Sequence, residues 1–147
     1  YRIRDGIQQV KKNDTIFSKC ENLLNNQQAI LIFPEGSHNR QRTIRPLSKG
    51  FTRIIFQTID NNPSLDITIL PVGITYQKSS TYPSKVAVHF GTGISVKDYL
   101  QENRFETIKM LKESVTKQLK KLSVHIPNDE NYPDILQNLN YPSEYLN

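Results

Sequence analysis

The apolar positions of this chain alternate between helical and strand-like spacing. From residue 14 to about residue 26 they recur at steps of three and four, which predicts an amphipathic helix with Asp14 as its N-cap. Residues 29–33 are all apolar, too few for a helix and followed by Pro34, so they predict a strand buried on both faces. Such a strand favours an α/β sheet.

More elements follow a polar loop at residues 35–47. Ser48 is expected to cap a second helix. The buried stripe of that helix would comprise Phe51, Ile54, Ile55 and Ile59. Residues 66–76 and 85–90 are rich in β-branched and aromatic side chains, which predicts two strands separated by the turn-rich segment 78–84.

The last long element is a helix at residues 105–122. Its predicted inner face consists of Phe105, Ile108, Leu111, Val115, Leu119 and Leu122. Prolines interrupt the remainder, which is expected to be irregular apart from one helical turn near residues 134–139. This order of elements predicts an α/β fold with a central, mostly β, sheet flanked by helices.

Composition narrows the class of protein. The chain has 147 residues, the size of one domain, and its hydrophobic fraction of 36% is low, which indicates a very polar surface or a missing part of the core. No apolar run reaches the roughly 18–20 residues that cross a bilayer. The single cysteine, Cys20, excludes an internal disulfide framework and a cysteine-based zinc cluster and favours a reducing compartment. With three scattered histidines, no metal site is expected.

Charge is unevenly distributed along the chain. The segment 36–59 contains five Lys or Arg residues and no acid, which equals the formal net charge of +5. Residues 122–147 contain four acids and no Lys or Arg, so the chain ends in an acidic tail. The basic segment is therefore the first place to look for an anionic ligand.

Glu35 stands at the exit of the predicted buried strand, where α/β folds usually bind ligands. Arginines 40, 42 and 45 follow, and Lys49 lies at a helix start, a combination that suits a phosphate group. Two simpler interpretations remain open. Glu35 could be a solvated acid or the ion-pair partner of Arg40 or Arg42, and the segment could be no more than a soluble basic loop.

Several short blocks resemble those of the glycerolipid acyltransferases, the family that includes lysophosphatidic acid (1-acylglycerol-3-phosphate) acyltransferases. The blocks are Phe33-Pro34-Glu35-Gly36-Ser37, Leu47-Ser48-Lys49-Gly50-Phe51 and Ile69-Leu70-Pro71-Val72-Gly73, which are similar to the third and fourth family blocks in order and spacing. Tyr1-Arg2-Ile3-Arg4 resembles the end of the second block. The resemblance covers about residues 1–122, leaving residues 123–147 as the irregular acidic tail.

The resemblance implies transfer of an acyl chain from acyl-CoA or acyl carrier protein to the hydroxyl of lysophosphatidic acid or a related glycerol phosphate lipid, in phospholipid biosynthesis. The acyl thioester is then a substrate, and no metal or organic cofactor is implied. Because acceptor and product are lipids, the protein is expected to be peripheral on the cytoplasmic face of a membrane.

The family's first block, a histidine followed five positions later by an aspartate, is absent. Thr43 stands five positions after His38 and Ile94 after His89. His125 is followed at that spacing by a glutamate, but in the tail, where an ordinary tail histidine is the simpler interpretation. The catalytic pair is therefore expected upstream of Tyr1, and this chain is expected to be an inactive, C-terminal part of the domain.

By position, the resemblance assigns acceptor binding to Glu35 and Gly36, with Ser37 beside them. Arg2 takes the role of the second-block arginine, with Arg4 as the alternative. The chain has His38 where the family commonly has an arginine, so the phosphate could contact His38 or one of the arginines at positions 40, 42 and 45. Lys49 could complete the anion site, although a solvated lysine is equally consistent with its position. Pro71 and Val72 would line the acyl pocket.

Two other functions are consistent with the charge. The first is a non-catalytic module that binds anionic phospholipid through residues 36–59. The second is nucleic-acid binding, for which a pI near 9.3 meets the electrostatic criterion. The basic loop has no interleaved aromatic residues for base stacking, so nucleic acid is not an expected partner.

Overall fold

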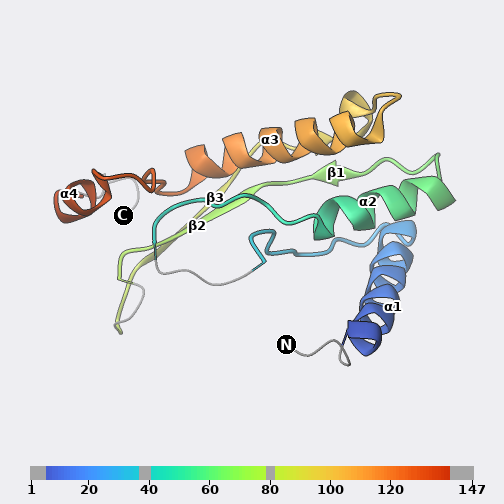
Figure 1. The fold of residues 1–147 in the computed structure, drawn as a ribbon, viewed down its shortest axis with the longest axis horizontal. Helices are drawn as coiled ribbons and strands as arrows, with labels where there is room; N and C mark the ends of the chain where they lie inside the picture. The colour runs from blue at the N-terminus through green and yellow to red at the C-terminus, as the bar shows by residue number, and fades with distance from the viewer. Residues whose placement is uncertain (1–5, 37–40, 79–81, 140–147) are drawn as a thin grey trace. The chain divides into compact units, whose positions relative to one another are not determined.

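The computed structural model describes residues 6–36, 41–78 and 82–139 and is shown in Figure 1. The chain divides into two compact units, Tyr1–Pro34 with Ser48–Ile67 and Glu35–Leu47 with Thr68–Asn147. In chain order the elements are α1 (Gly6–Asn25), α2 (Gly50–Asn61), β1 (Thr68–Ile69), β2 (Val72–Tyr76), β3 (Val86–Phe90), β4 (Ile94–Ser95), the 3-10 helix η2 (Lys97–Tyr99), α3 (Arg104–Leu122) and α4 (Tyr132–Gln137).

Helices α1 and α2 pack on each other and make up the first unit. The guanidinium of Arg53 lies 4.4 Å from the ring centroid of Phe17, a cation–π contact. The Glu21 carboxylate accepts hydrogen bonds from the side-chain amides of two α2 residues, Gln57 at 2.9 Å and Asn61 at 2.6 Å. A cation–π contact and two hydrogen bonds therefore join the two helices.

Both helices lie where the sequence predicts them, but their N-terminal boundaries differ from the prediction. Helix α1 begins at Gly6, so Asp14 lies within it and is not its N-cap. Good helix formers between Gly6 and Asp14, such as Gln and Lys, allow this earlier start. Ser48 is not the cap of α2 either, because Lys49 holds the N-cap position without a side-chain hydrogen bond. The predicted stripe is confirmed at Phe51, Ile54 and Ile55, which are buried, whereas Ile59 is half-buried.

The strand predicted at residues 29–33 is wrong. These residues belong to no helix or strand, and no strand of the described part of the chain pairs with them. Leu31 and Phe33 are 78% and 73% exposed instead of buried. A strand requires a neighbour for its backbone groups, and apolar character does not supply one. Directly after the run, the Pro34 carbonyl accepts a hydrogen bond of 2.7 Å from the N–H of Ser48, which closes the base of the loop at residues 35–47.

The second unit holds two small antiparallel sheets, β1 with β4 and β2 with β3. Strands were predicted at residues 66–76 and 85–90, and the structure confirms them, with Pro71 dividing the first into β1 and β2. Mixed helix and strand content is confirmed as well. The single central sheet is not what the described residues form, because each sheet has two strands.

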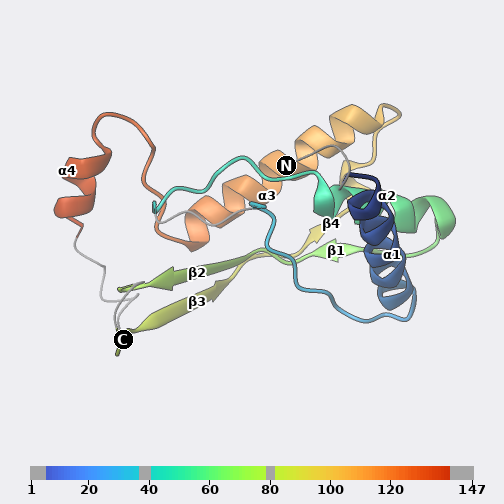
Figure 2. The same ribbon diagram turned by 60° about the horizontal axis from the view of Figure 1, so that its bottom comes forward.

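Helix α3 packs on β2, as Figure 2 shows. A Cβ atom at Gly73 of β2 would collide with the carbonyl group of Leu122, so the strand can approach the end of the helix this closely only without a side chain. Leu111 and Val115 of α3 are buried, as predicted. Phe105 is 70% exposed, contrary to prediction. It lies in the first turn, where Asn103 caps the helix by accepting a hydrogen bond from its N–H.

The chain continues beyond α3 as an irregular segment and the short helix α4, close to the helical turn predicted at residues 134–139. Tyr132 and Pro133 start this helix, which fits the preference of proline for the first helical turn. Among the described residues, no helix is both long and apolar enough to cross a membrane.

Candidate functional site

The loop after Pro34 begins with a backbone conformation that favours glycine. Gly36 has a φ of +74°, in the left-handed region that other residues adopt at a cost. Glu35 and Gly36 are the two block residues to which the resemblance assigns acceptor binding. The glycine is thus explained by the turn itself, and the glutamate is the residue of the two that can contribute chemistry.

Glu35 forms an ion pair with Arg45 at the other end of the same loop. The Nε of Arg45 donates to Oε2 of Glu35 at 3.3 Å, and their side chains are 26% and 30% exposed. The sequence suggested Arg40 or Arg42 as a partner of Glu35, but Arg42 points elsewhere and Arg40 lies outside the described residues. A single, partly exposed contact of this kind contributes about 0–1 kcal/mol, so a ligand can compete for either side chain.

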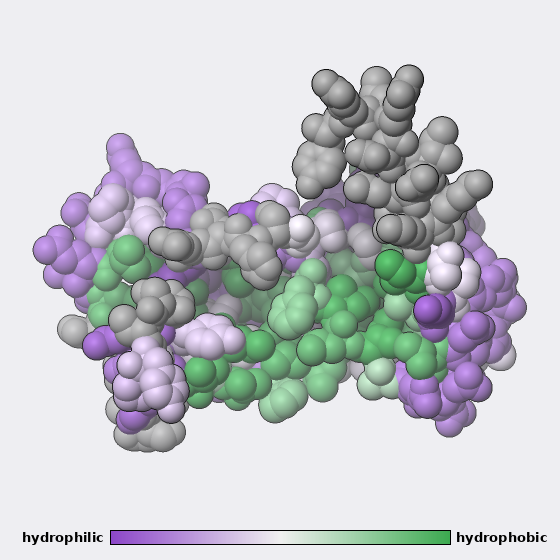
Figure 3. Space-filling model, turned by 90° about the horizontal axis from the view of Figure 1, so that it is seen from below, coloured by the Kyte–Doolittle hydropathy of each residue, from purple (hydrophilic) through white to green (hydrophobic). Residues whose placement is uncertain are grey.

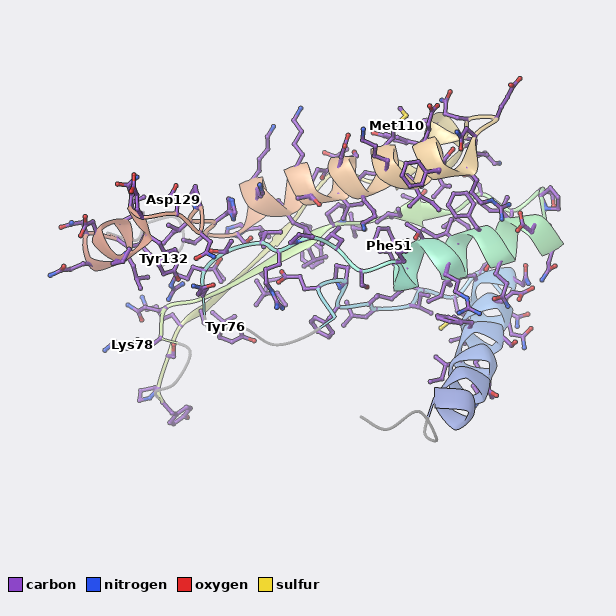
Figure 4. The ribbon with its side chains drawn as sticks, viewed as in Figure 1. Phe51, Tyr76, Lys78, Met110, Asp129 and Tyr132 are labelled. Atoms are coloured by element: carbon purple, nitrogen blue, oxygen red, sulfur yellow. The ribbon has the colours of Figure 1, made fainter. Side chains whose placement is uncertain are left out.

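Arg42 has a structural role at the end of β2. Its guanidinium donates to two consecutive backbone carbonyls, those of Tyr76 at 3.0 Å and Gln77 at 3.2 Å. Its own backbone carbonyl accepts a hydrogen bond of 2.7 Å from the N–H of Ile126. Figure 4 shows Tyr76 and Tyr132 at this same end of the hairpin. Arg42 therefore anchors the loop to the hairpin and to the segment after α3.

The segment after α3 holds the loop through a series of hydrogen bonds. Thr43 Oγ1 donates to the carbonyl of Ile126 at 2.7 Å, and Gln41 Nε2 donates to Oδ1 of Asn128 at 3.1 Å. No motif or spacing in the sequence predicts this role. A hydrogen bond between residues more than 80 positions apart leaves no periodic pattern in the sequence that could predict it.

His125 belongs to the same set of contacts. Its Nδ1 accepts a hydrogen bond of 3.0 Å from the N–H of Ile44, which requires an unprotonated Nδ1. Burial lowers the pKa of His125, and the positive charge of Lys120 lowers it further. Both effects favour the neutral ring that this hydrogen bond needs, so the geometry gives His125 a structural task in the tail.

The remaining predicted site residues are placed as follows. Four of them lie outside the described residues: Arg2, Ser37, His38 and Arg40. Lys49 is exposed in the first unit, and its backbone carbonyl accepts hydrogen bonds from Thr52 Oγ1 and from the N–H of Arg53, so its main chain starts α2. Within the described ranges, no three His, Cys, Asp or Glu side chains cluster as metal ligands would.

Comparison with known proteins gives a consistent family. Residues 4–75 match the family model described as acyltransferase. The chain is 27% identical over 110 residues to glycerol-3-phosphate O-acyltransferase 1 of Saccharomyces cerevisiae, an alignment that covers 71% of this chain and 14% of that protein. It is 24% identical over 106 residues to an uncharacterized acyltransferase of Schizosaccharomyces pombe, covering 69% of this chain and 16% of the relative.

The chain thus spans about one seventh of the length of these two curated relatives. No solved structure matches it. The family match includes Glu35 and Arg45 but ends at residue 75, before β3, α3 and the segment that holds the loop. The resemblance inferred from the sequence blocks is confirmed by these matches.

Proposed function

We propose that this chain belongs to the glycerolipid acyltransferase family and supplies the acceptor-binding part of an enzyme that acylates a glycerol phosphate. The acyl donor is acyl-CoA or acyl carrier protein. The acceptor is lysophosphatidic acid or a related glycerol phosphate lipid, and the enzyme works at the cytoplasmic surface of a membrane because its product is a lipid. The observation that carries the proposal is the ion pair between Glu35 and Arg45 in the third block.

The pair offers two complementary groups to such an acceptor. The Arg45 guanidinium can donate paired hydrogen bonds to phosphate oxygens, and the Glu35 carboxylate can accept a hydrogen bond from a glycerol hydroxyl. Because the ion pair is weak, its opening costs little when the ligand arrives. Arg42 is less suited to the phosphate, since its guanidinium contacts the carbonyls of Tyr76 and Gln77. The contacts assigned to Arg2 or Arg4, His38, Arg40 and Lys49 stay predictions from the sequence blocks.

The chemical step needs a base as well as a bound acceptor. The acceptor oxygen attacks the thioester carbonyl, its proton passes to the base, and the carbon–sulfur bond breaks as the thiol leaves with a proton. The family resemblance assigns the base to a histidine paired with an aspartate, and we propose that the parent protein supplies this pair from a part preceding Tyr1. His125 is not proposed for the task, because its Nδ1 is engaged by the N–H of Ile44.

Binding of the acceptor can be tested on the chain itself, by calorimetric titration with glycerol 3-phosphate. We expect Glu35→Gln and Arg45→Gln each to weaken binding by about tenfold or more, as loss of a hydrogen bond to a charged group does. Glu102→Gln and Arg104→Gln are the matched controls, since both residues are exposed and outside the loop. Equal losses in all four variants, or none, would refute the assignment.

Acyl transfer is then tested in the parent protein by thioester release from acyl-CoA. Lysophosphatidic acid and glycerol 3-phosphate are compared as acceptors, which separates the two acceptor classes. The same substitutions at Glu35 and Arg45 should reduce the rate, whereas those at Glu102 and Arg104 should not. Turnover unaffected by Glu35→Gln would contradict the proposed role of the carboxylate.

A non-catalytic lipid-binding module built on residues 36–59 has less support. Arg42 and Arg45 of that segment contact oxygen atoms of the protein itself. Two of its five cations are thereby engaged within the unit, which weakens the case for this segment as a membrane-binding surface.

A further inference from the structure

One face of the β2–β3 hairpin is apolar along its whole length. Side chains of a strand alternate between its two faces, so paired residues at every second position share a face. The pairs on the outer face are Val72 with Phe90, Ile74 with Val88, and Tyr76 with Val86. The other face holds Gly73, Thr75, Ala87 and His89, with Gly73 against the end of α3.

This outer face is exposed to solvent. Phe90 is 68% exposed, and Ile74, Val86 and Val88 are each exposed by at least 40%. Leu70, just before β2, is 52% exposed. Figure 3 views the molecule from below Figure 1 and shows many apolar residues (green) exposed on that side. A contiguous apolar surface on a two-stranded sheet indicates that something covers it in the working protein.

The charged side chains carried by the two strands and their turn are lysines. No Asp or Glu occurs from residue 67 to residue 97, whereas Lys78 and Lys85 flank the turn between the strands. The backbone N–H of Gln77 donates to the carbonyl of Lys85 at 3.0 Å, which brings the two lysine positions to the same end of the hairpin. Tyr82, in the turn itself, is 98% exposed.

Apolar side chains bordered by tyrosine and lysine are typical of surfaces that enter the boundary between lipid head groups and acyl chains. Tyrosine has an apolar ring with a polar tip, and lysine keeps its charge at the head groups while its stem lies along the apolar region. The hairpin itself presents lysines and no acid, which favours contact with anionic lipids. Two copies of the chain would gain no such charge pairing through this face, because the hairpin offers no acid to the partner's lysines.

We propose that the outer face of the β2–β3 hairpin docks on an anionic phospholipid bilayer. Ile74, Val88 and Phe90 enter the boundary with the acyl chains, and Lys78 and Lys85 contact the head groups. The inference rests on the proposed function in one respect, that a lipid acceptor has to be reached at a membrane. This surface lies outside the Glu35–Arg45 pair, so membrane docking and acceptor binding can be measured separately.

The test is sedimentation of the 147-residue chain with phosphatidylcholine vesicles, with and without phosphatidylserine. Phe90→Ser should lower the partition coefficient by about tenfold, because an apolar ring no longer leaves water. Phe105→Ser is the matched control, since Phe105 is 70% exposed but lies on α3. The double variant Lys78→Gln/Lys85→Gln should lose about thirtyfold on anionic vesicles and nothing on neutral ones, at about 1 kcal/mol per lysine.

Several results would overturn the proposal. The first is an equal loss of vesicle binding in Phe90→Ser and Phe105→Ser. The second is unchanged binding of the double lysine variant to anionic vesicles. The lysine variant also keeps the test valid if Phe90→Ser fails to fold. A chain that does not bind the vesicles but elutes as a dimer dissociated by Phe90→Ser would assign the face to a second copy. Glycerol 3-phosphate titration of the double lysine variant separates membrane docking from acceptor binding. Vesicle binding can be lost while glycerol 3-phosphate binding persists, and glycerol 3-phosphate binding can be lost while vesicle binding persists.

Discussion

The hydroxyl oxygen of Tyr132 accepts a hydrogen bond of 2.9 Å from the backbone N–H of Arg42, which lies 90 positions earlier in the chain. The carbonyl of the same Arg42 accepts from Ile126, so both polar groups of its main chain are satisfied by residues that follow α3. Loop residues 41–44 are thus held in place by a segment well beyond the family match at residues 4–75. The acidic tail contributes to the architecture around the candidate site.

Removing the Tyr132 hydroxyl should destabilise this arrangement. Tyr132→Phe leaves the N–H of Arg42 without its acceptor, and we expect the free energy of unfolding to fall by about 1 kcal/mol. Urea denaturation followed by circular dichroism measures the change. Tyr82→Phe removes the same group from a residue that is 98% exposed and should leave the midpoint unchanged. Identical midpoints for the two variants would show that the Tyr132 contact contributes nothing.

Stability should decline below about pH 6.5 because of His125. Its pKa is lowered from 6.5 in the folded chain, so the unfolded chain binds a proton more readily as the pH falls. The contribution of the neutral ring is therefore present above pH 6.5 and is lost as the pH falls toward the lowered pKa. Urea midpoints measured across this range should show it.

His125→Asn is the control for this pH dependence. An asparagine side chain can still accept a hydrogen bond from the N–H of Ile44, but it does not titrate. The urea midpoint of the variant should fall less steeply with acidification than that of the original chain. Parallel curves for the two proteins would assign the pH dependence to other groups.

Gly73 should not tolerate even a methyl group. A Cβ atom there would overlap the carbonyl of Leu122, so strand β2 and helix α3 would have to move apart. We expect Gly73→Ala to cost about 1–3 kcal/mol, as overpacking of a filled interior does. In Gly50→Ala the new Cβ would be 3.7 Å from Oγ of Ser48, an ordinary contact, and stability should be unchanged or slightly higher. Thermal unfolding of both variants compares the two positions.

Breaking the Glu35–Arg45 pair should change stability by less than about 1 kcal/mol, because both side chains are partly exposed. Chemical denaturation of Glu35→Gln, Arg45→Gln and the double variant gives the coupling energy between the two residues. A small value means that any loss of acceptor binding in these variants comes from the lost contact with the ligand. A loss of several kcal/mol would contradict the weak-pair interpretation and make the pair a structural element.

The sequence predicted those elements whose stability depends on their own pattern. Helix α3 was predicted within one residue because its apolar positions, such as Leu111 and Val115, recur at helical spacing over five turns. The strand predicted at residues 29–33 was wrong, because apolar character does not show whether a neighbouring strand is available for pairing. Pro71 similarly divides one predicted strand into β1 and β2, with different partners.

The candidate site was predicted in part, for a comparable reason. Local blocks identified Glu35 and Gly36, and the positive φ of Gly36 gives that glycine a local cause. The choice of Arg45 as partner depends on how the loop folds back, and the contact between Tyr132 and Arg42 depends on the path of the chain after α3. Contacts between residues so far apart in the chain depend on the three-dimensional structure and leave no periodic pattern in a single sequence.

The hydrogen bond between Ser48 and Pro34 has a consequence for how relatives of this protein can diversify. It joins the two residues that flank the loop 35–47. The length and sequence of this loop can therefore change between relatives without disturbing α1 and α2. The hydrogen bonds of Ile126 and Tyr132 with Arg42 restrict that freedom, because a loop exchanged alone would lose them. A chimera that takes the loop from a relative should therefore acquire that relative's acceptor preference when residues 124–132 are exchanged as well.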